Sequence, residues 1–212
     1  MKIAIVGANG KTGFQTILKA LDMGHSVTAI VRNPATISLK HECLQIKRAD
    51  LLSENTALEE AIAGHDAVIS AIGISSGLNA KVTLYSKGTD RLIKALSNKG
   101  VKRLVCISSI GIDQEKDPNI PFIFQDVLFP LIFSNSAADM RKMESSIKDS
   151  ELNWTIIRPA GLTNKLPTWK YRIAVAPSLP RPYVISRADV ADFMIKALDK
   201  PEYFRQTVSL AD

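Results

Sequence analysis

The sequence predicts an α/β fold: a doubly wound, mainly parallel sheet with helices on both faces, in a single domain over residues 1–212. Two observations lead to this prediction. Short β-branched, apolar runs alternate with helical patterns from the first residues onward, and these runs are apolar throughout rather than at every second position. Strands of that kind are buried on both faces, as in a parallel sheet covered by helices. A chain of 212 residues is long enough for one such domain and short for two.

Six segments are expected to be strands, with helices between them. The expected strands are Lys2–Val6, Ser26–Val31, Leu44–Lys47, Ala67–Ser70, Arg103–Ile107 and Trp154–Ile157. Apolar residues at helical spacing predict one helix that ends near Gly24, a second that Gly100 closes, and a third from about Asp139 to Asp149. In a sheet of this type, ligands bind at the carboxyl ends of the strands.

The composition is typical of a globular enzyme, with 46% apolar and 23% charged residues. The formal charge of +6 could indicate nucleic acid as a partner. However, the lysines and arginines are scattered, and few aromatic residues lie among them. We therefore expect a solvated basic surface, which helps to attract a polyanionic dinucleotide, and no nucleic-acid partner.

The two cysteines, Cys43 and Cys106, form no C-x-x-C pair and lie in strand-like apolar runs. This pattern predicts buried free thiols in a reducing compartment. The chain starts directly with a core strand, so no signal peptide is expected. The most apolar stretch, residues 120–133, is broken by two prolines and is shorter than the roughly 20 residues that span a bilayer. The expectation is a cytoplasmic monomer or homodimer without a membrane partner or a metal site.

The strongest motif is the turn Gly7-Ala8-Asn9-Gly10-Lys11-Thr12-Gly13, which follows the first strand and opens the first helix. Its three glycines allow a sharp turn, a close approach of the backbone to a pyrophosphate, and close packing of the helix on the sheet. Free N–H groups at the helix start then bind the anion. A P-loop is excluded, because it needs glycine five residues before Gly10, where Ile5 stands. The turn predicts a Rossmann-type dinucleotide site.

The end of the second strand indicates which dinucleotide is bound. Proteins selective for NAD place an acidic residue there to accept a hydrogen bond from the ribose 2′-hydroxyl. Here the position holds Arg32, whose guanidinium suits a 2′-phosphate in charge and in geometry. The prediction is NADP(H) in preference to NAD(H). A surface arginine with no part in cofactor choice is the alternative.

Three further strand ends are candidates for cofactor contacts. Asp50 and Leu51 follow the third strand, where Asp50 would accept from the adenine amino group or cap a helix. Ala71-Ile72-Gly73 would lie beside the ribose or form a plain turn. Ser109, after the fifth strand, is the polar candidate to hold the nicotinamide amide or a reacting atom; a hydroxyl bonded to backbone is the alternative.

Taken together, several segments resemble the atypical short-chain dehydrogenase/reductases. They are the glycine turn, Arg32, Ser108-Ser109, Trp154 to Thr163, Asp139 to Glu144 and Val184 to Ala191. The chain looks most like the flavin reductase/biliverdin-IXβ reductase branch and its bacterial NAD(P)H-binding, NmrA-like relatives. The resemblance implies a dinucleotide site lined by Gly7, Asn9, Gly10, Lys11, Thr12, Gly13, Arg32, Asp50, Leu51, Ala71, Ile72 and Gly73. It also implies that Ser109, Pro159 and Leu162 lie beside the nicotinamide.

The chain departs from the wider superfamily at the proton donor. Carbonyl reductases of this group use a Tyr-x-x-x-Lys pair, but no tyrosine here has lysine four residues later. Alignment on Glu144 puts Ser136 and Met140 at the two positions. The flavin-reductase-like branch also lacks the pair. Its vertebrate enzyme carries two histidines that correspond to Met140 and Gly161 here, which argues against biliverdin as the substrate.

These observations favour an NAD(P)H-dependent reductase that transfers hydride to a flavin or similar flat acceptor, because solvent can then supply the proton. A non-catalytic NADP(H)-binding redox sensor of NmrA type is the alternative. An enzyme acting on sugar nucleotides or phenylpropanoids is a third possibility, although the part after Thr163 is short for it. A small substrate-side region is expected at about 110–135 and 160–185. Within it, segment 120–133 would cover a flat substrate ring, pair with another subunit or pack within the fold.

Overall fold

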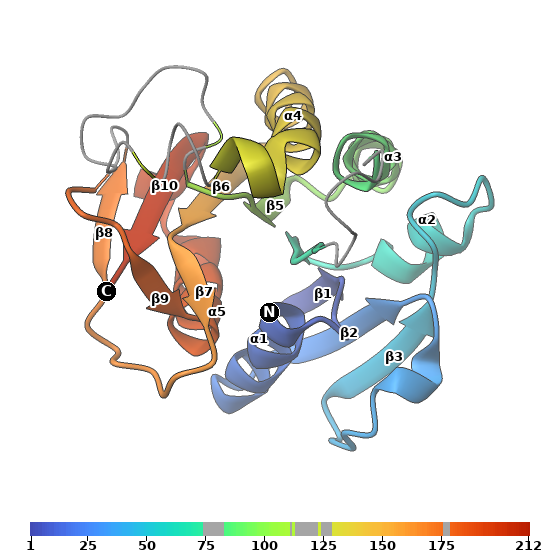
Figure 1. The fold of residues 1–212 in the computed structure, drawn as a ribbon. Helices are drawn as coiled ribbons and strands as arrows, with labels where there is room; N and C mark the ends of the chain where they lie inside the picture. Colours follow the sequence, from blue (N-terminus) through green and yellow to red (C-terminus); the bar gives the residue numbers. More distant parts are fainter. Residues whose placement is uncertain (74–82, 111, 113–122, 124–128, 176–178) are drawn as a thin grey trace.

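The computed structural model describes residues 1–73, 83–110, 112, 123, 129–175 and 179–212. Their centre is one eight-stranded sheet in the order β3-β2-β1-β4-β5-β6-β10-β8 (Figure 1). Its strands are β1 (Lys2–Val6), β2 (Ser26–Val31), β3 (Leu44–Arg48), β4 (Ala67–Ser70), β5 (Arg103–Ile107), β6 (Asn153–Pro159), β8 (Arg172–Val175) and β10 (Gln206–Ala211). Only the edge pair of β10 and β8 is antiparallel among these described strands. The predicted doubly wound, mainly parallel sheet is confirmed.

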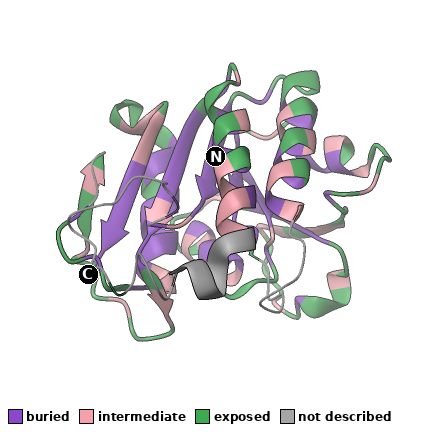
Figure 2. Ribbon diagram, turned by 45° about the horizontal axis from the view of Figure 1, so that its top comes forward, coloured by how far each residue is buried: buried purple, intermediate pink, exposed green. Residues whose placement is uncertain are grey.

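Helices cover both faces of the sheet, as predicted. They are α1 (Lys11–Asp22), α2 (Ala57–Ile62), α3 (Leu84–Asn98), α4 (Phe129–Lys148) and α5 (Arg187–Lys196). Helices α1 and α5 bury their apolar sides in one core cluster, and α2, α3 and α4 bury theirs in the other. The inner strands of the sheet are buried, whereas the edge strands β3 and β8 and the outward sides of the helices are partly or fully exposed (Figure 2).

Side-chain alternation along each strand explains the two clusters. In β1, Ile3 and Ile5 belong to the cluster under α1 and α5, while Ala4 and Val6 belong to the cluster under α3 and α4. Successive side chains of a strand point to opposite faces. Because both faces are covered, every position must be apolar, and this is the continuous pattern seen in the sequence.

Three predictions from the sequence need correction, and the first two concern helices and strands. Helix α4 begins at Phe129, ten residues before the expected start near Asp139. Short elements were also missed: α2, α5, the 3-10 helices η1 (Pro34–Thr36), η3 (Ala197–Asp199) and η4 (Pro201–Tyr203), and four strands. Two of these, β7 (Gly161–Thr163) and β9 (Val184–Ser186), pair in parallel as a separate small sheet. Segments of three residues are too short for a periodic pattern to show.

The third correction concerns the cysteines. Cys106 is a buried free thiol in β5, as predicted, and burial raises its pKa to about 12. Cys43 precedes β3 and is only partly buried. In the described residues, no helix is both long and apolar enough to span a membrane. The predicted segment 120–133 lies largely outside those residues.

Arg103 of β5 connects segments that lie far apart in the sequence. Its side chain is 5% exposed and donates to the carbonyl oxygens of Ala197 (2.6 Å), Leu198 (3.0 Å) and Asn153 (2.6 Å). The guanidinium carbon also lies 4.5 Å from the centre of the Phe204 ring. Burial lowers the pKa of Arg103 to about 10, so the group is charged at neutral pH. This arginine ties β5 to the turn that follows α5.

We expect Arg103→Met to lower the free energy of unfolding by about 3 kcal/mol, because it leaves several buried carbonyl groups without a donor. Urea unfolding followed by far-UV circular dichroism measures the change. Arg48→Met is the matched control, because Arg48 is exposed at the end of β3. Equal midpoints for the two variants would contradict the assigned role of Arg103.

Candidate dinucleotide-binding cleft

The glycine turn between β1 and α1 packs against the end of β4 without room for side chains. Gly7 has a φ of 74°, and a Cβ on it would lie 2.7 Å from the carbonyl oxygen of Ala71. A Cβ on Gly13 would collide with the carbonyl oxygen of Gly7. The first glycine therefore permits the turn, and the last permits the close contact of α1 with it.

The start of α1 has the features of an anion site. The helix begins at Lys11 with Gly10 as its N-cap, no side chain caps it, and no acidic residue lies in its first turn. Its first N–H groups have no acceptor within the helix, and the helix dipole adds partial positive charge there. A pyrophosphate fits this end, so the turn meets the physical demands of a dinucleotide.

A cleft of about 830 Å³ extends from this turn across the carboxyl ends of the strands. The sequence-predicted residues that line it are Gly7, Asn9, Gly10, Lys11, Thr12, Arg32, Asp50, Leu51, Ala71, Ile72, Gly73, Ser109, Pro159 and Leu162. Residues from six separate segments thus meet at one place. Gly13 is not part of the lining. It packs against the Gly7 backbone and so permits the close contact of α1 with the turn.

Arg32 and Asp50 stand at the exposed end of the cleft. Arg32 follows β2 and is exposed, with no ion pair in the described part of the chain. Asp50 is also exposed, and its Oδ1 accepts from the N–H of Leu52 at 2.9 Å. That bond stabilises the turn after β3. Asp50 does not cap α2, since that helix begins seven residues later at Ala57.

The two serines after β5 differ in their hydroxyl groups. Ser109 lines the cleft, but its Oγ lies 3.2 Å from the carbonyl oxygen of Ile110 and donates to it. Ser108 also lines the cleft, and its hydroxyl is buried and has no partner among the described residues. A buried hydroxyl without a partner costs about 1–3 kcal/mol. A ligand that reaches Ser108 would remove that cost.

The cleft is also lined by residues that the sequence analysis did not assign to the cofactor site. They include Tyr85 of α3, Ser108, Ile110 and Ile112 after β5, Ser136, Ala137 and Met140 of α4, and Arg187 of α5. Asp139 of α4 positions Tyr85, because its carboxylate accepts from the N–H groups of Tyr85 (2.9 Å) and Ser86 (3.3 Å). Arg187 lies in the segment Val184 to Ala191, which carries part of the family resemblance. No sequence pattern indicated that α5 starts at the cleft.

This arrangement defines a class of protein: a Rossmann-type fold with a dinucleotide cleft at the carboxyl edge of its sheet. The model of the NAD(P)H-binding family matches residues 7–201, so the chain belongs to that family. No group of three or more potential metal ligands occurs among the residues that the structure describes.

Two relatives match almost the whole chain. An uncharacterised chloroplast protein of Arabidopsis thaliana is 34% identical over 210 residues, which are 95% of this chain and 73% of the relative. YhfK, an uncharacterised sugar epimerase of Bacillus subtilis, is 29% identical over 94% of this chain and 89% of its own length.

Solved structures agree on the fold. A Rossmann-fold NAD(P)-binding family protein of Shigella flexneri is 25% identical, with a TM-score of 0.74 over 100% of this chain and 93% of that one. ChuY, an anaerobilin reductase of Escherichia coli O157:H7, has a TM-score of 0.80 and is 21% identical, over 100% of this chain and 97% of its own. The likeness to ChuY supports the fold alone.

The two serines give opposite expectations for stability and binding. Ser108→Ala removes a buried hydroxyl without a partner, so we expect an unchanged or higher unfolding free energy together with roughly fivefold weaker NADPH binding. Ser109→Ala removes a hydrogen bond, so we expect about 1 kcal/mol lower stability and unchanged NADPH affinity.

Urea unfolding and titration of NADPH fluorescence measure the two quantities. Thr89→Val is the matched control, because the Thr89 hydroxyl is also buried without a partner in the described chain but Thr89 does not line the cleft. If only the Ser109 variant bound NADPH more weakly, the result would contradict this expectation. It would support the contact with the nicotinamide amide that the sequence predicts for Ser109.

Proposed function

We propose that this chain is an NADPH-dependent reductase that transfers hydride to a flavin or a similarly flat acceptor. One observation carries the proposal. The cleft continues beyond the part that faces the glycine turn into a space with apolar walls, formed by Ile110, Ile112, Met140 and Leu162. Apolar walls suit a flat ring. The sequence-predicted residues that line the cleft are proposed as the cofactor site. Ser109 would line it without using its hydroxyl, which donates to the carbonyl oxygen of Ile110.

The chemistry needs little from the side chains. NADPH supplies a hydride, and reduction of a flavin takes that hydride and one proton from water. Ser136 and Met140 stand at the two positions of the superfamily's Tyr-Lys pair, and both line the cleft. Neither can act as a tyrosine-like acid. The protein's contribution is then to hold two rings together and to keep bulk water from the space between them.

We expect purified protein to oxidise NADPH in the presence of FMN, riboflavin or a simple quinone faster than the protein-free mixture does. Absorbance at 340 nm follows the reaction. Gly7→Val should abolish the activity, because its side chain would collide with Ala71. Gly64→Val is the matched control: Gly64 also has a positive φ, of 72°, but nothing lies within 4 Å of its Cβ position. No oxidation with any of the acceptors would contradict the proposal.

NADP(H) is proposed over NAD(H) on the strength of Arg32, an exposed cation at the end of β2 where NAD-selective proteins have an acid. We expect Arg32→Ala to weaken NADPH binding about tenfold or more and to change NADH binding by less than twofold, because only NADPH carries the 2′-phosphate. Fluorescence titration measures both constants. Arg48→Ala is the control for lost charge, since Arg48 ends β3 outside the lining. Equal losses for both cofactors would remove Arg32 from this role.

A non-catalytic NADP(H) sensor is the second candidate. Its support is the missing Tyr-Lys pair, which leaves Ser136 and Met140 in the cleft. A sensor would bind NADPH tightly without oxidising it. Sugar-nucleotide chemistry, suggested by the name of the Bacillus subtilis relative, would also give no net oxidation with flavins or quinones. The absorbance assay therefore separates the reductase from both.

The cytoplasm remains the proposed compartment.

A further inference from the structure

We infer that Arg187 binds an anionic oxygen group, a phosphate or carboxylate, on the hydride acceptor. The inference rests on the proposed reductase function and narrows its substrates to flat acceptors that carry such a group, FMN in preference to riboflavin. Arg187 is the first residue of α5 and is partly buried. Its side chain lines the cleft together with Gly161 and Leu162.

The orientation of Arg187 is fixed by its own hydrogen bonds. Nη1 donates to the carbonyl oxygen of Leu162 at 3.2 Å and to Oδ1 of Asn164 at 2.8 Å. Both acceptors follow β6 in the chain, and Leu162 lines the cleft. The Nε and Nη2 groups have no acceptor, and no carboxylate forms an ion pair with Arg187, among the described residues. A guanidinium held in this way has a free edge for a ligand.

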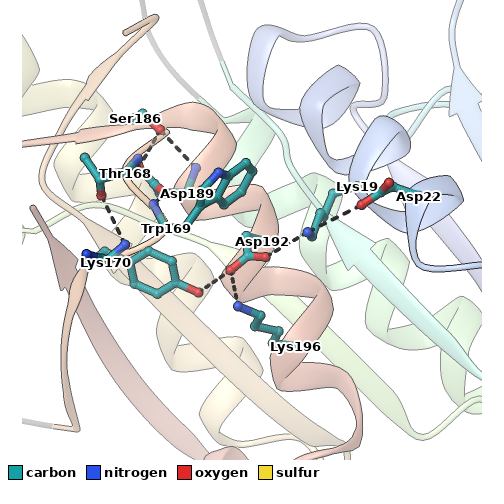
Figure 3. Close-up of polar contacts among 10 residues, drawn as sticks. Lys19, Asp22, Thr168, Trp169, Lys170, Ser186, Asp189, Asp192 and Lys196 are labelled. Atoms are coloured by element: carbon teal, nitrogen blue, oxygen red, sulfur yellow. Dashed lines mark hydrogen bonds and ion pairs between the residues drawn. The ribbon is translucent and has the colours of Figure 1, made fainter. Parts of the chain in front are cut away.

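The start of α5 is rigid, so the direction of Arg187 is set before a ligand arrives. The Ser186 hydroxyl caps the helix by accepting from the N–H of Asp189 at 3.0 Å. The buried Asp189 carboxylate accepts from that hydroxyl (2.7 Å) and from the N–H groups of Thr168 (3.0 Å) and Trp169 (2.8 Å). Figure 3 shows how these groups converge on Asp189.

A second group of charges ties α5 to α1. The buried carboxylate of Asp192 lies 3.1 Å from Nζ of Lys19 and 2.7 Å from Nζ of Lys196 (Figure 3). It also accepts from the hydroxyl of Tyr171. Burial alone would raise the pKa of Asp192, but these three donors outweigh it and lower the pKa. The carboxylate stays ionised at neutral pH, and the helix that carries Arg187 is anchored at two places.

Charge matching assigns Arg187 to the acceptor rather than to the cofactor. The cations in the described lining are Lys11, Arg32 and Arg187. Lys11 stands at the pyrophosphate end of α1, and Arg32 stands at the end of β2. Arg187 bonds to the chain that follows β6, and β6 is four strand spacings from β2 in the sheet, about 19 Å. The 2′-phosphate at Arg32 is therefore out of reach of Arg187, and the start of α1 with Lys11 serves the pyrophosphate. The remaining cation faces apolar walls, where an anion on the acceptor would pair with it.

FMN and riboflavin test this inference directly, because they share one ring system and differ by a phosphate. With NADPH as the donor, we expect wild type to show at least tenfold higher kcat/KM for FMN. Arg187→Gln should raise the KM for FMN about tenfold or more, while the KM values for riboflavin and for NADPH stay within twofold of wild type. The ratio of kcat/KM for FMN to kcat/KM for riboflavin should then fall to near one. Arg187→Lys, which keeps the charge, should retain part of the preference. A naphthoquinone carboxylate compared with naphthoquinone tests a carboxylate in the same way.

Arg181→Gln is the matched control, because Arg181 is exposed and lies outside the lining. It should leave the FMN preference intact. Thermal unfolding of both variants checks that the fold is retained. Equal losses with FMN and riboflavin would show that Arg187 only holds the Leu162 segment, and a higher KM for NADPH would show that it binds the cofactor. Either result overturns the inference, as does a wild type without preference.

Failure of the proposed function is distinguishable from failure of this inference. Flavin fluorescence titrated with protein in the presence of NADP⁺ reports binding without turnover. If wild type reduces nothing yet binds FMN at least tenfold more tightly than riboflavin, and Arg187→Gln abolishes that difference, the anion site stands and the reductase proposal falls. Equal binding of the two flavins by wild type overturns the anion site.

Discussion

The structure depends on the contact between the glycine turn and the end of β4. Gly7 touches the Ala71 backbone, and Gly13 touches the carbonyl group of Gly7, at distances that no side chain tolerates. This contact places the uncapped end of α1 directly over the carboxyl edge of the sheet. It therefore creates the anion site and opens the cleft beside it. Larger residues at these positions would displace the helix, and both features would be lost together.

The cleft has two ends of different character, and the sheet order explains the difference. Strands β1 to β4 contribute the glycine turn, Arg32 and Asp50, which form a polar, exposed end. The chain after β5 and β6, with α4 and α5, contributes a mainly apolar end with three serines and one cation in the described lining. A dinucleotide that lies across the strands would present its phosphates to the first end and its reactive ring to the second. The proposals on cofactor and acceptor follow from this division.

The sequence predicted the parts of the fold that local patterns report. Four of the six expected strands match the observed bounds fully, because buried parallel strands are apolar at every position. The early part of α4 and the small β7–β9 sheet were missed. A three-residue strand shows no periodicity, and whether such a segment pairs depends on a partner some twenty residues away, as Leu162 pairs with Ile185.

By itself, the sequence determined the Rossmann-type fold, the phosphate-binding turn and the cation at the end of β2, because each of these follows from neighbouring residues. Only the tertiary structure decided which of the two hydroxyls has no partner among the described residues and which arginine of the C-terminal half lines the cleft. Ser108 and Ser109 are equivalent in the sequence, but within the described part of the chain only the hydroxyl of Ser109 has a backbone acceptor. Arg187 resembles any surface arginine until Leu162 and α5 meet. Hydrogen bonding and charge pairing depend on distances between segments, and the folded chain alone sets those distances.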